Sequence, residues 1–179
     1  MTAQELDCVI DRATLDDLPA MAAIHVAGWK QVYREIMPAD ELKKWTLDAR
    51  EQMWRDVVEQ ASPPIHTLVA RDDHGAVLGF CSAGPSRDDS FPIKREVYAV
   101  YVTPDAQRLG IGATLFVLIL QALKAEKIDH AYTWVPLGNT AAMDFFESMG
   151  GVSIGEGVSP AGIPQVAYAW RNLAELLDR

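Results

Sequence analysis

Residues 96–120 of this 179-residue chain read EVYAVYVTPDAQRLGIGATLFVLIL. The first seven of these residues are mostly β-branched or aromatic, which predicts a strand over 96–102. The apolar residues after Gly112 recur at helical spacing, which predicts a helix over 112–124. The turn between the strand and the helix carries Gly110 and Gly112, and the function of the chain is best sought there.

The glycine turn has the composition of a phosphate-binding loop. Glycines just before a helix let the backbone approach a ligand closely. The unpaired N–H groups of the first helical turn point at that ligand, and the helix dipole favours negative charge there. Arg108 adds a positive side chain beside the turn. The sequence therefore predicts a backbone cradle for a phosphate or a diphosphate.

Three kinds of phosphate loop compete for this turn. A P-loop ends in Gly-Lys-Ser/Thr, whereas Gly112 is followed by Ala113 and Thr114. A dinucleotide-binding loop needs a third glycine, and Leu115 stands at that position. The third kind fits without change: Gln107-x-x-Gly110-x-Gly112 after a strand resembles motif A of the GCN5-related N-acetyltransferase (GNAT) superfamily.

The rest of the chain reads as one α+β domain over residues 1–179, with a mixed, mostly antiparallel sheet flanked by helices. Thr14 and Asp17 have the spacing of a capping box at the start of the first helix. Strands are predicted at 8–10, 65–70, 76–83, 96–102, 131–135 and 165–170. Helices are predicted from 14 towards Tyr33, after Thr46, and at 112–124, 139–149 and 173–177.

A second segment extends the resemblance to GNAT enzymes. Asn139 begins a predicted helix that closes with Phe145-Phe146-Glu147 and Gly150, as a late helix of that family often does. The resemblance implies a V-shaped split between two central strands, in which acetyl-CoA lies as the acyl donor. It also implies the cofactor-binding residues Val100, Tyr101 and Val102 on the strand, Gln107, Arg108, Leu109, Gly110, Ile111, Gly112 and Ala113 in the turn, and Asn139 and Phe146 on the later helix.

The reaction implied is acetyl transfer to an amine by direct attack on the thioester. An alkylammonium with a pKa of about 10.4 must first lose its proton, and Glu96, at the start of the central strand, corresponds to a residue that often takes it in the family. A solvated glutamate at a strand end is the alternative. Many members place a tyrosine seven residues after the asparagine to protonate the thiolate, but here Phe146 stands there. Tyr101 is the replacement that we favour, with Tyr98, Tyr132 and Tyr33 as further options; the alternative is that the thiolate leaves unaided. Gly151 also replaces the usual aromatic residue.

The acceptor amine belongs to a small molecule or a peptide, and its identity stays open. Trp29 and Tyr33 fall where GNAT acceptor loops lie and are the candidate substrate residues. Because Phe146 cannot donate a proton, a GNAT-like module that binds acetyl-CoA without catalysis is a second hypothesis. A nucleotide-dependent enzyme that uses the same turn is a third.

Composition narrows the partners and the location. Sixteen basic and twenty-five acidic residues give a net charge of −9, which disfavours nucleic acid as a partner and suits either a cationic acceptor or simple solubility. Cys8 and Cys81 form no Cys-x-x-Cys pair, and the four histidines share no ligand spacing, so no metal site is predicted. With neither a signal peptide nor a membrane-length apolar run, we expect a cytoplasmic protein without a membrane partner, and a homodimer is compatible with the sequence.

Overall fold

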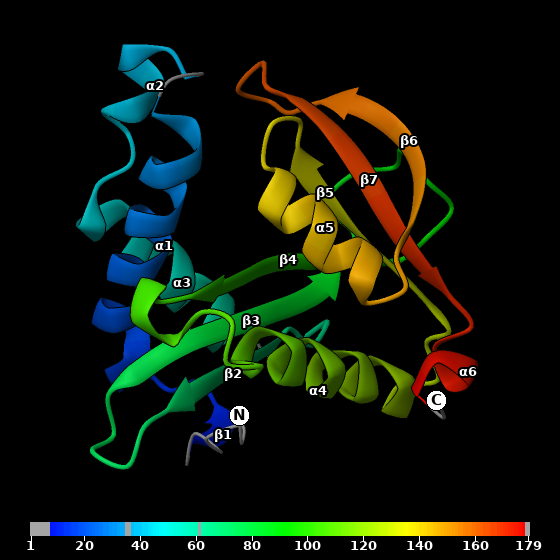
Figure 1. Ribbon diagram of the computed structural model, residues 1–179, viewed down its shortest axis with the longest axis horizontal. Coiled ribbons are helices and arrows are strands. Elements are labelled where there is room, and N and C mark those ends of the chain that lie inside the picture. Colours follow the sequence, from blue (N-terminus) through cyan, green and yellow to red (C-terminus); the bar gives the residue numbers. More distant parts are fainter. Residues whose placement is uncertain (1–7, 35–36, 61, 178–179) are drawn as a thin grey trace.

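A computed structural model describes residues 8–34, 37–60 and 62–177, and it contains a seven-stranded sheet in the order β1-β2-β3-β4-β5-β7-β6 (Figure 1). The strands are β1 (Val9–Arg12), β2 (His66–Arg71), β3 (Val77–Pro85), β4 (Arg95–Val102), β5 (His130–Pro136), β6 (Val152–Val158) and β7 (Pro164–Arg171). The helices are α1 (Leu18–Tyr33), α2 (Ala39–Leu42), α3 (Leu47–Glu59), α4 (Ile111–Ala125), α5 (Thr140–Ser148) and α6 (Leu173–Leu177), with short 3-10 turns at Leu15–Asp17 and Pro104–Ala106.

Each predicted strand and helix is present, and the mixed, mostly antiparallel sheet confirms the fold class. The capping box is also present, because the N–H of Thr14 donates to Asp17 Oδ2 at 2.7 Å. Two elements, α2 and β6, had no clear signal in the sequence. In β6, Gly155 and Gly157 replace the alternating apolar residues of a typical strand, because their faces lie against the rings of Phe91 and Trp134.

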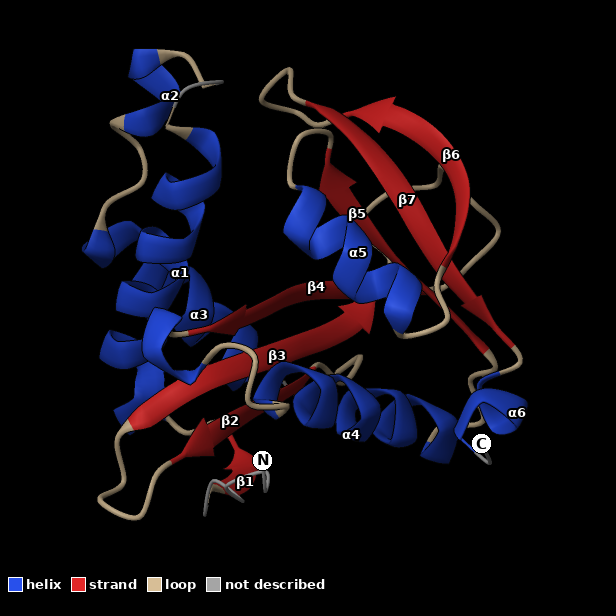
Figure 2. Ribbon diagram, in the orientation of Figure 1, coloured by secondary structure: helices blue, strands red, loops and turns tan. Residues whose placement is uncertain are grey.

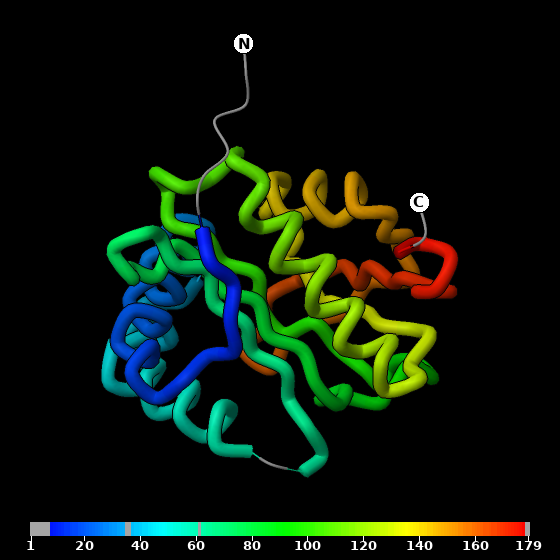
Figure 3. Tube along the Cα trace, turned by 90° about the horizontal axis from the view of Figure 1, so that it is seen from below, coloured from blue at the N-terminus to red at the C-terminus, as the bar shows by residue number. Residues whose placement is uncertain are grey.

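Helices cover both faces of the sheet (Figure 3). Alternate residues of a strand point to opposite faces, so Val69 and Phe80 pack with α1 and α3, while their neighbours Ala70 and Cys81 pack with α4. The buried stripe of α4 supplies much of the larger core, with Ile111, Leu115, Phe116, Ile119, Leu120 and Leu123. Among the described residues, no helix combines the length and the apolar character needed to cross a membrane.

The centre of the sheet is split. β4 and β5 run parallel, but the only registered pair between them is Glu96 with Tyr132, whereas β4 pairs with β3 along most of its length. Beyond that pair β4 runs towards α1, while β5 turns away under α5 (Figure 2). The β3–β4 register also shifts at Tyr98, because Ser82 pairs with Ala99 and Ala83 pairs with Val97. Such a bulge bends its strand, and here it lies where the two strands begin to separate.

Candidate active site

The glycine turn lies between β4 and α4 and is exposed to solvent. Gly110 is the N-cap of α4 with φ of +86°, and Arg108 has φ of +65°. Both values lie in the left-handed region, where glycine is favoured because it has no Cβ. No atom lies within 4 Å of the position that a Cβ on Gly110 would take. The backbone of the turn is therefore open to a ligand.

The turn also has unused hydrogen-bond donors. The first amide to bond into α4 is that of Thr114, which donates to Gly110 O at 3.0 Å. Over the ranges that the structure describes, the N–H groups of residues 108–113 have no acceptor. Gln107 differs, because its N–H donates to Pro104 O at 3.3 Å and its side chain donates to Val102 O at 3.1 Å. The expectation that Gln107 supplies a backbone donor is therefore corrected: the free amides begin at Arg108, and Gln107 fixes the turn to the end of β4.

Gly112 lies between the end of β4 and helix α5. A Cβ at this position would lie 3.5 Å from Val102 of β4 and 3.7 Å from the ring of Phe145 of α5. These are ordinary contact distances, so a methyl group would fit between the neighbouring side chains. It would also occupy the space between the turn and α5. Free amides, the exposed Gly110 and the half-buried Gly112 thus come together with the end of β4 at one end of the split.

The β4 residues beyond the split, Val100, Tyr101 and Val102, are half-buried. Their strand pairs with β3 on one side only, so the other backbone edge is available to a ligand. The Tyr101 ring lies on the α1 face, with its centroid 4.8 Å from that of His25. Burial raises the pKa of Tyr101 far above its ordinary value, so its hydroxyl stays protonated at neutral pH.

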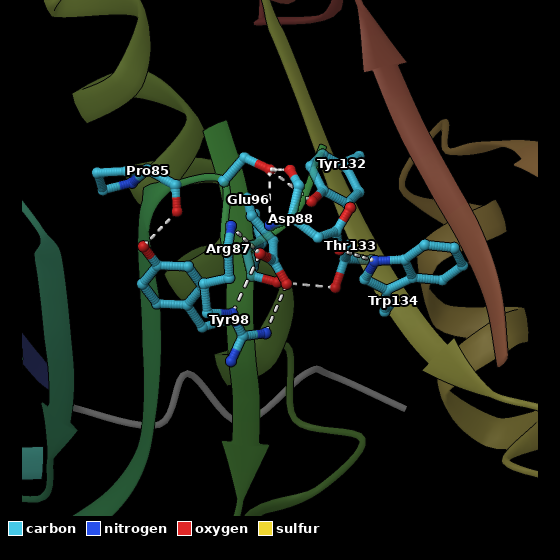
Figure 4. Close-up of polar contacts among 10 residues, drawn as sticks. Pro85, Arg87, Asp88, Glu96, Tyr98, Tyr132, Thr133 and Trp134 are labelled. Atoms are coloured by element: carbon cyan, nitrogen blue, oxygen red, sulfur yellow. Dashed lines mark hydrogen bonds and ion pairs between the residues drawn. The ribbon is translucent and has the colours of Figure 1, made fainter. Parts of the chain in front are cut away.

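Glu96 lies at the closed end of the split and is 1% exposed. Its carboxylate is held by Arg87, whose Nη2 donates to Oε1 at 2.5 Å and whose Nε and backbone N–H donate to Oε2 at 3.1 and 3.0 Å (Figure 4). Burial disfavours the charged guanidinium, but the hydrogen bonds and charge of Glu96 outweigh this and raise the pKa of Arg87. Arg87 also lies 4.6 Å over the ring of Tyr98. No pattern in the sequence predicts the pairing of Arg87 with Glu96, because the contact depends on how the β3–β4 loop folds back.

The same loop joins β4 to β5 by side chains (Figure 4). Ser86 hydrogen-bonds the hydroxyl of Tyr132 at 2.8 Å, and Asp88 accepts from Trp134 Nε1 at 2.8 Å. Thr133 Oγ1 of β5 donates to Val97 O of β4, also at 2.8 Å. Backbone pairing between these strands is restricted to one position, so this polar network holds the closed end together.

The chain matches the family model described as "Acetyltransferase (GNAT) family" over residues 28–151, which is more than half of its length. The chain belongs to the GNAT acetyltransferase family.

Similar proteins agree with this membership. The uncharacterized N-acetyltransferase YuaI of Bacillus subtilis is 26% identical over 170 residues, covering 93% of this chain and 95% of that protein. An L-methionine sulfoximine/L-methionine sulfone acetyltransferase of Pseudomonas aeruginosa is 28% identical over 141 residues, covering 77% of this chain and 76% of its own. The crystal structure of the PaiA N-acetyltransferase from Thermoplasma acidophilum, in complex with coenzyme A, superposes with a TM-score of 0.69, at 18% identity, over 90% of this chain and 98% of that one.

The later GNAT-like segment forms α5, which begins at Asn139 as expected, but Phe146 takes a different place from the one expected. Asn139 is the N-cap of α5, and its side-chain oxygen accepts from the N–H of Ala142 at 3.2 Å. Phe146 is 6% exposed and packs against Phe116 and Trp170 in the core. Phe145 is the ring beside Gly112. In this structure Phe145, and not Phe146, therefore lines the split.

The two residues assigned to the acceptor lie together but are largely covered. Trp29 stacks between Tyr33 and Trp45, with ring centroids 3.8 and 3.4 Å away. Ile163, from the β6–β7 loop, packs on the same cluster, which brings the far half of the sheet against α1. Burial, and to a lesser degree the neighbouring Tyr101, raises the pKa of Tyr33 well above its ordinary value. Trp29 and Tyr33 therefore shape one wall of the split mainly through packing. Among the described residues, no group of His, Cys, Asp or Glu is placed to hold a metal ion.

Proposed function

We propose that this GNAT protein transfers the acetyl group of acetyl-CoA to the amine of a small molecule or peptide. The observation that carries the proposal is the row of free amides at residues 108–113, in a turn that is exposed beside the split over residues 108–110. A diphosphate needs several convergent N–H donors and close backbone approach, and this turn offers both. The coenzyme A complex of the Thermoplasma relative and the acetyltransferase names of the sequence relatives support the same donor.

The cofactor's parts match groups along the split. The amides of residues 108–113 would hold the diphosphate, with Arg108 beside them. The unpaired edge of β4 over Val100–Val102 would hydrogen-bond the amide-bearing arm, as a further strand would. The Nδ2 group of Asn139 would add a contact from α5, because the other end of that side chain caps the helix. When bound, the cofactor supplies an activated acetyl group.

The proton of the incoming ammonium must leave before the nitrogen can attack, and we assign its acceptance to Glu96, directly or through water. A carboxylate has about four acceptor positions. Arg87 occupies two on Oε2 and one on Oε1, so Oε1 keeps one position for a water molecule or the amine. Arg87 fixes the direction of the carboxylate, because two of its donors come from a planar guanidinium.

The other two requirements fall on β4. Negative charge that develops on the carbonyl oxygen is stabilised by a backbone N–H of residues 100–102, on the edge that β5 leaves free. Tyr101 is the proposed hydrogen-bond donor to the departing thiolate, because its hydroxyl is protonated at neutral pH; its raised pKa favours sharing that proton in a hydrogen bond over giving it up. With Tyr101 as donor, the phenylalanine at position 146 does not prevent catalysis.

The test is thiol release from acetyl-CoA over a panel of amines, together with calorimetric titration of coenzyme A. We expect both turnover and binding, and both should be lost in Gly112→Glu, whose side chain would fill the passage beside Phe145. Binding without turnover across a broad panel would refute catalysis. Absence of heat on titration would refute the cofactor site itself.

A further inference from the structure

A cavity of about 830 Å³ opens between the two halves of the molecule. Its walls are Ala27, Lys30, Gln31 and Val32 of α1, the C-cap residue Arg34, Leu42 of α2, and Gly138 in the loop between β5 and α5. In Figure 1, α1 and α2 stand on one side of the split, and the β5–α5 loop stands on the other. The cavity therefore spans the split, in a position to receive a small molecule.

The charged groups lining this cavity are both cations. Lys30 and Arg34 are one helical turn apart and exposed, and neither forms an ion pair within the described ranges. The nearest acids on α2, Asp40 and Glu41, are already paired with Lys43 and Lys44 at 2.9 and 2.6 Å. Over the described residues, the cavity wall carries two cations and no acid, whereas the whole chain carries a net charge of −9.

The cations lie close to the proposed reaction centre. Gly28 follows Ala27 on α1, and a Cβ there would lie 2.7 Å from the ring of Tyr101, so α1 directly contacts the strand assigned to catalysis. At a rise of 1.5 Å and a rotation of 100° per residue, Lys30 lies about 3 Å and Arg34 about 9 Å further along the helix than Gly28, and about 160° and 120° around it. Their long side chains therefore reach the split around the side of the helix, through the cavity that they line. The short distances along the helix suit a small molecule with its amine near β4 and its anion on these two side chains.

We propose that the acceptor is an amino-acid-like amine whose carboxylate is held by Lys30 and Arg34. The inference rests on the proposed acetyl transfer and adds the substrate class. The net charge of the chain alone would suit a cationic acceptor. The inference is the opposite, because the ligand responds to the charge of the cavity wall and not to that of the whole surface. The two cations orient the acceptor, and its uncharged amine is left to attack.

The experiment uses matched amines: leucine, glutamine, phenylalanine and methionine, each as the free acid and as its carboxamide, assayed by thiol release. The variant is Lys30→Gln/Arg34→Gln, on an exposed stripe where substitution spares the core. Its control is Lys43→Gln/Lys44→Gln, which removes the same charge from the turn just after α2, outside the cavity. Comparing variant with wild type for each amine cancels differences in amine basicity.

We expect wild type to prefer the free acids, and the variant to lose about tenfold or more in kcat/KM for them, the ratio that corresponds to about 1.4 kcal/mol. The carboxamides and the control should change less than about twofold, within the ordinary effect of an exposed charge. Equal losses for acids and carboxamides would overturn the inference. A raised KM for acetyl-CoA would also overturn it, because the cations would then bind the phosphates of the cofactor. A wild type that prefers carboxamides or polyamines would overturn the inference and leave acetyl transfer intact. Absence of turnover with every amine would instead refute the proposed function, and the inference with it.

Discussion

Replacing Gly112 with alanine should separate stability from cofactor binding, because the two effects have opposite signs. Gly112 lies in the first turn of α4 without a left-handed φ, and the new Cβ would meet Val102 and Phe145 at ordinary distances of 3.5 and 3.7 Å. Alanine is favoured over glycine in a helix by about 0.5–1 kcal/mol. For a domain of this size, each kcal/mol raises Tm by about 2–4 °C. The variant should therefore melt slightly higher than wild type.

Cofactor binding by the same variant should weaken by about tenfold or more, or about 1.4 kcal/mol, because the methyl group stands in the passage that the diphosphate needs. The assay is thermal unfolding with and without coenzyme A, which gives stability and ligand-induced stabilisation from one sample. Gly110→Ala is the matched control for strain: its φ of +86° should cost about 1–2 kcal/mol of stability. A Gly112→Ala protein that is stabilised yet keeps the full shift with coenzyme A would refute the placement of the cofactor.

Three further predictions concern protons. Arg87→Met should lower kcat, because Glu96 loses the two guanidinium hydrogen bonds that fix the direction of its carboxylate; an unchanged kcat would show that Arg87 does not position the base. Tyr101→Phe should lower kcat about tenfold to a hundredfold with little change in KM, measured by thiol release; unchanged kcat would remove Tyr101 from the mechanism. Burial, with a smaller effect of Arg50, lowers the pKa of His25 from 6.5 to about 3. Between these two pH values the unfolded chain binds a proton that the folded chain does not. The free energy of unfolding therefore falls as the pH falls from 6.5 towards 3. In His25→Asn, whose amide oxygen can accept the hydrogen bond of Trp54, the slope of unfolding free energy against pH should decrease by up to about 1.4 kcal/mol per pH unit in that window; an unchanged slope would show that His25 is protonated in the folded state.

The elements that the sequence predicted well are those with local causes. Strand β4, the glycine turn and helix α4 follow from periodicity and composition within about 25 residues, and the capping box at Thr14 needs only a spacing of three. Strand β6 has no such local cause, because its glycines leave room for the rings of Phe91 and Trp134, which come from distant segments. The local sequence pattern therefore cannot predict these glycines or the strand that contains them.

The site shows the same limit more sharply. Phe145 and Phe146 are adjacent on α5 and differ by about 100° around its axis, so which ring faces Gly112 depends on how the helix is rotated. That rotation is set by Phe116 and Trp170, which hold Phe146 in the core. The position of Phe146 in the motif alone gives no information about this packing. The Arg87–Glu96 pair is likewise invisible in the sequence, because it depends on the path of the β3–β4 loop.

The split itself supports the proposed use of β4. A strand edge with unpaired N–H and C=O groups is a liability, and proteins normally cover it or pair it. Here the bulge at Tyr98 bends β4 away from β5, and the side chains of Ser86, Thr133 and Trp134 hold the two strands together only at the closed end. A sheet that needed only stability would continue the backbone ladder instead. An edge kept open beside a turn of free amides is best explained by a ligand that completes the ladder, and an extended, amide-bearing arm with a diphosphate at its end does so at both places at once.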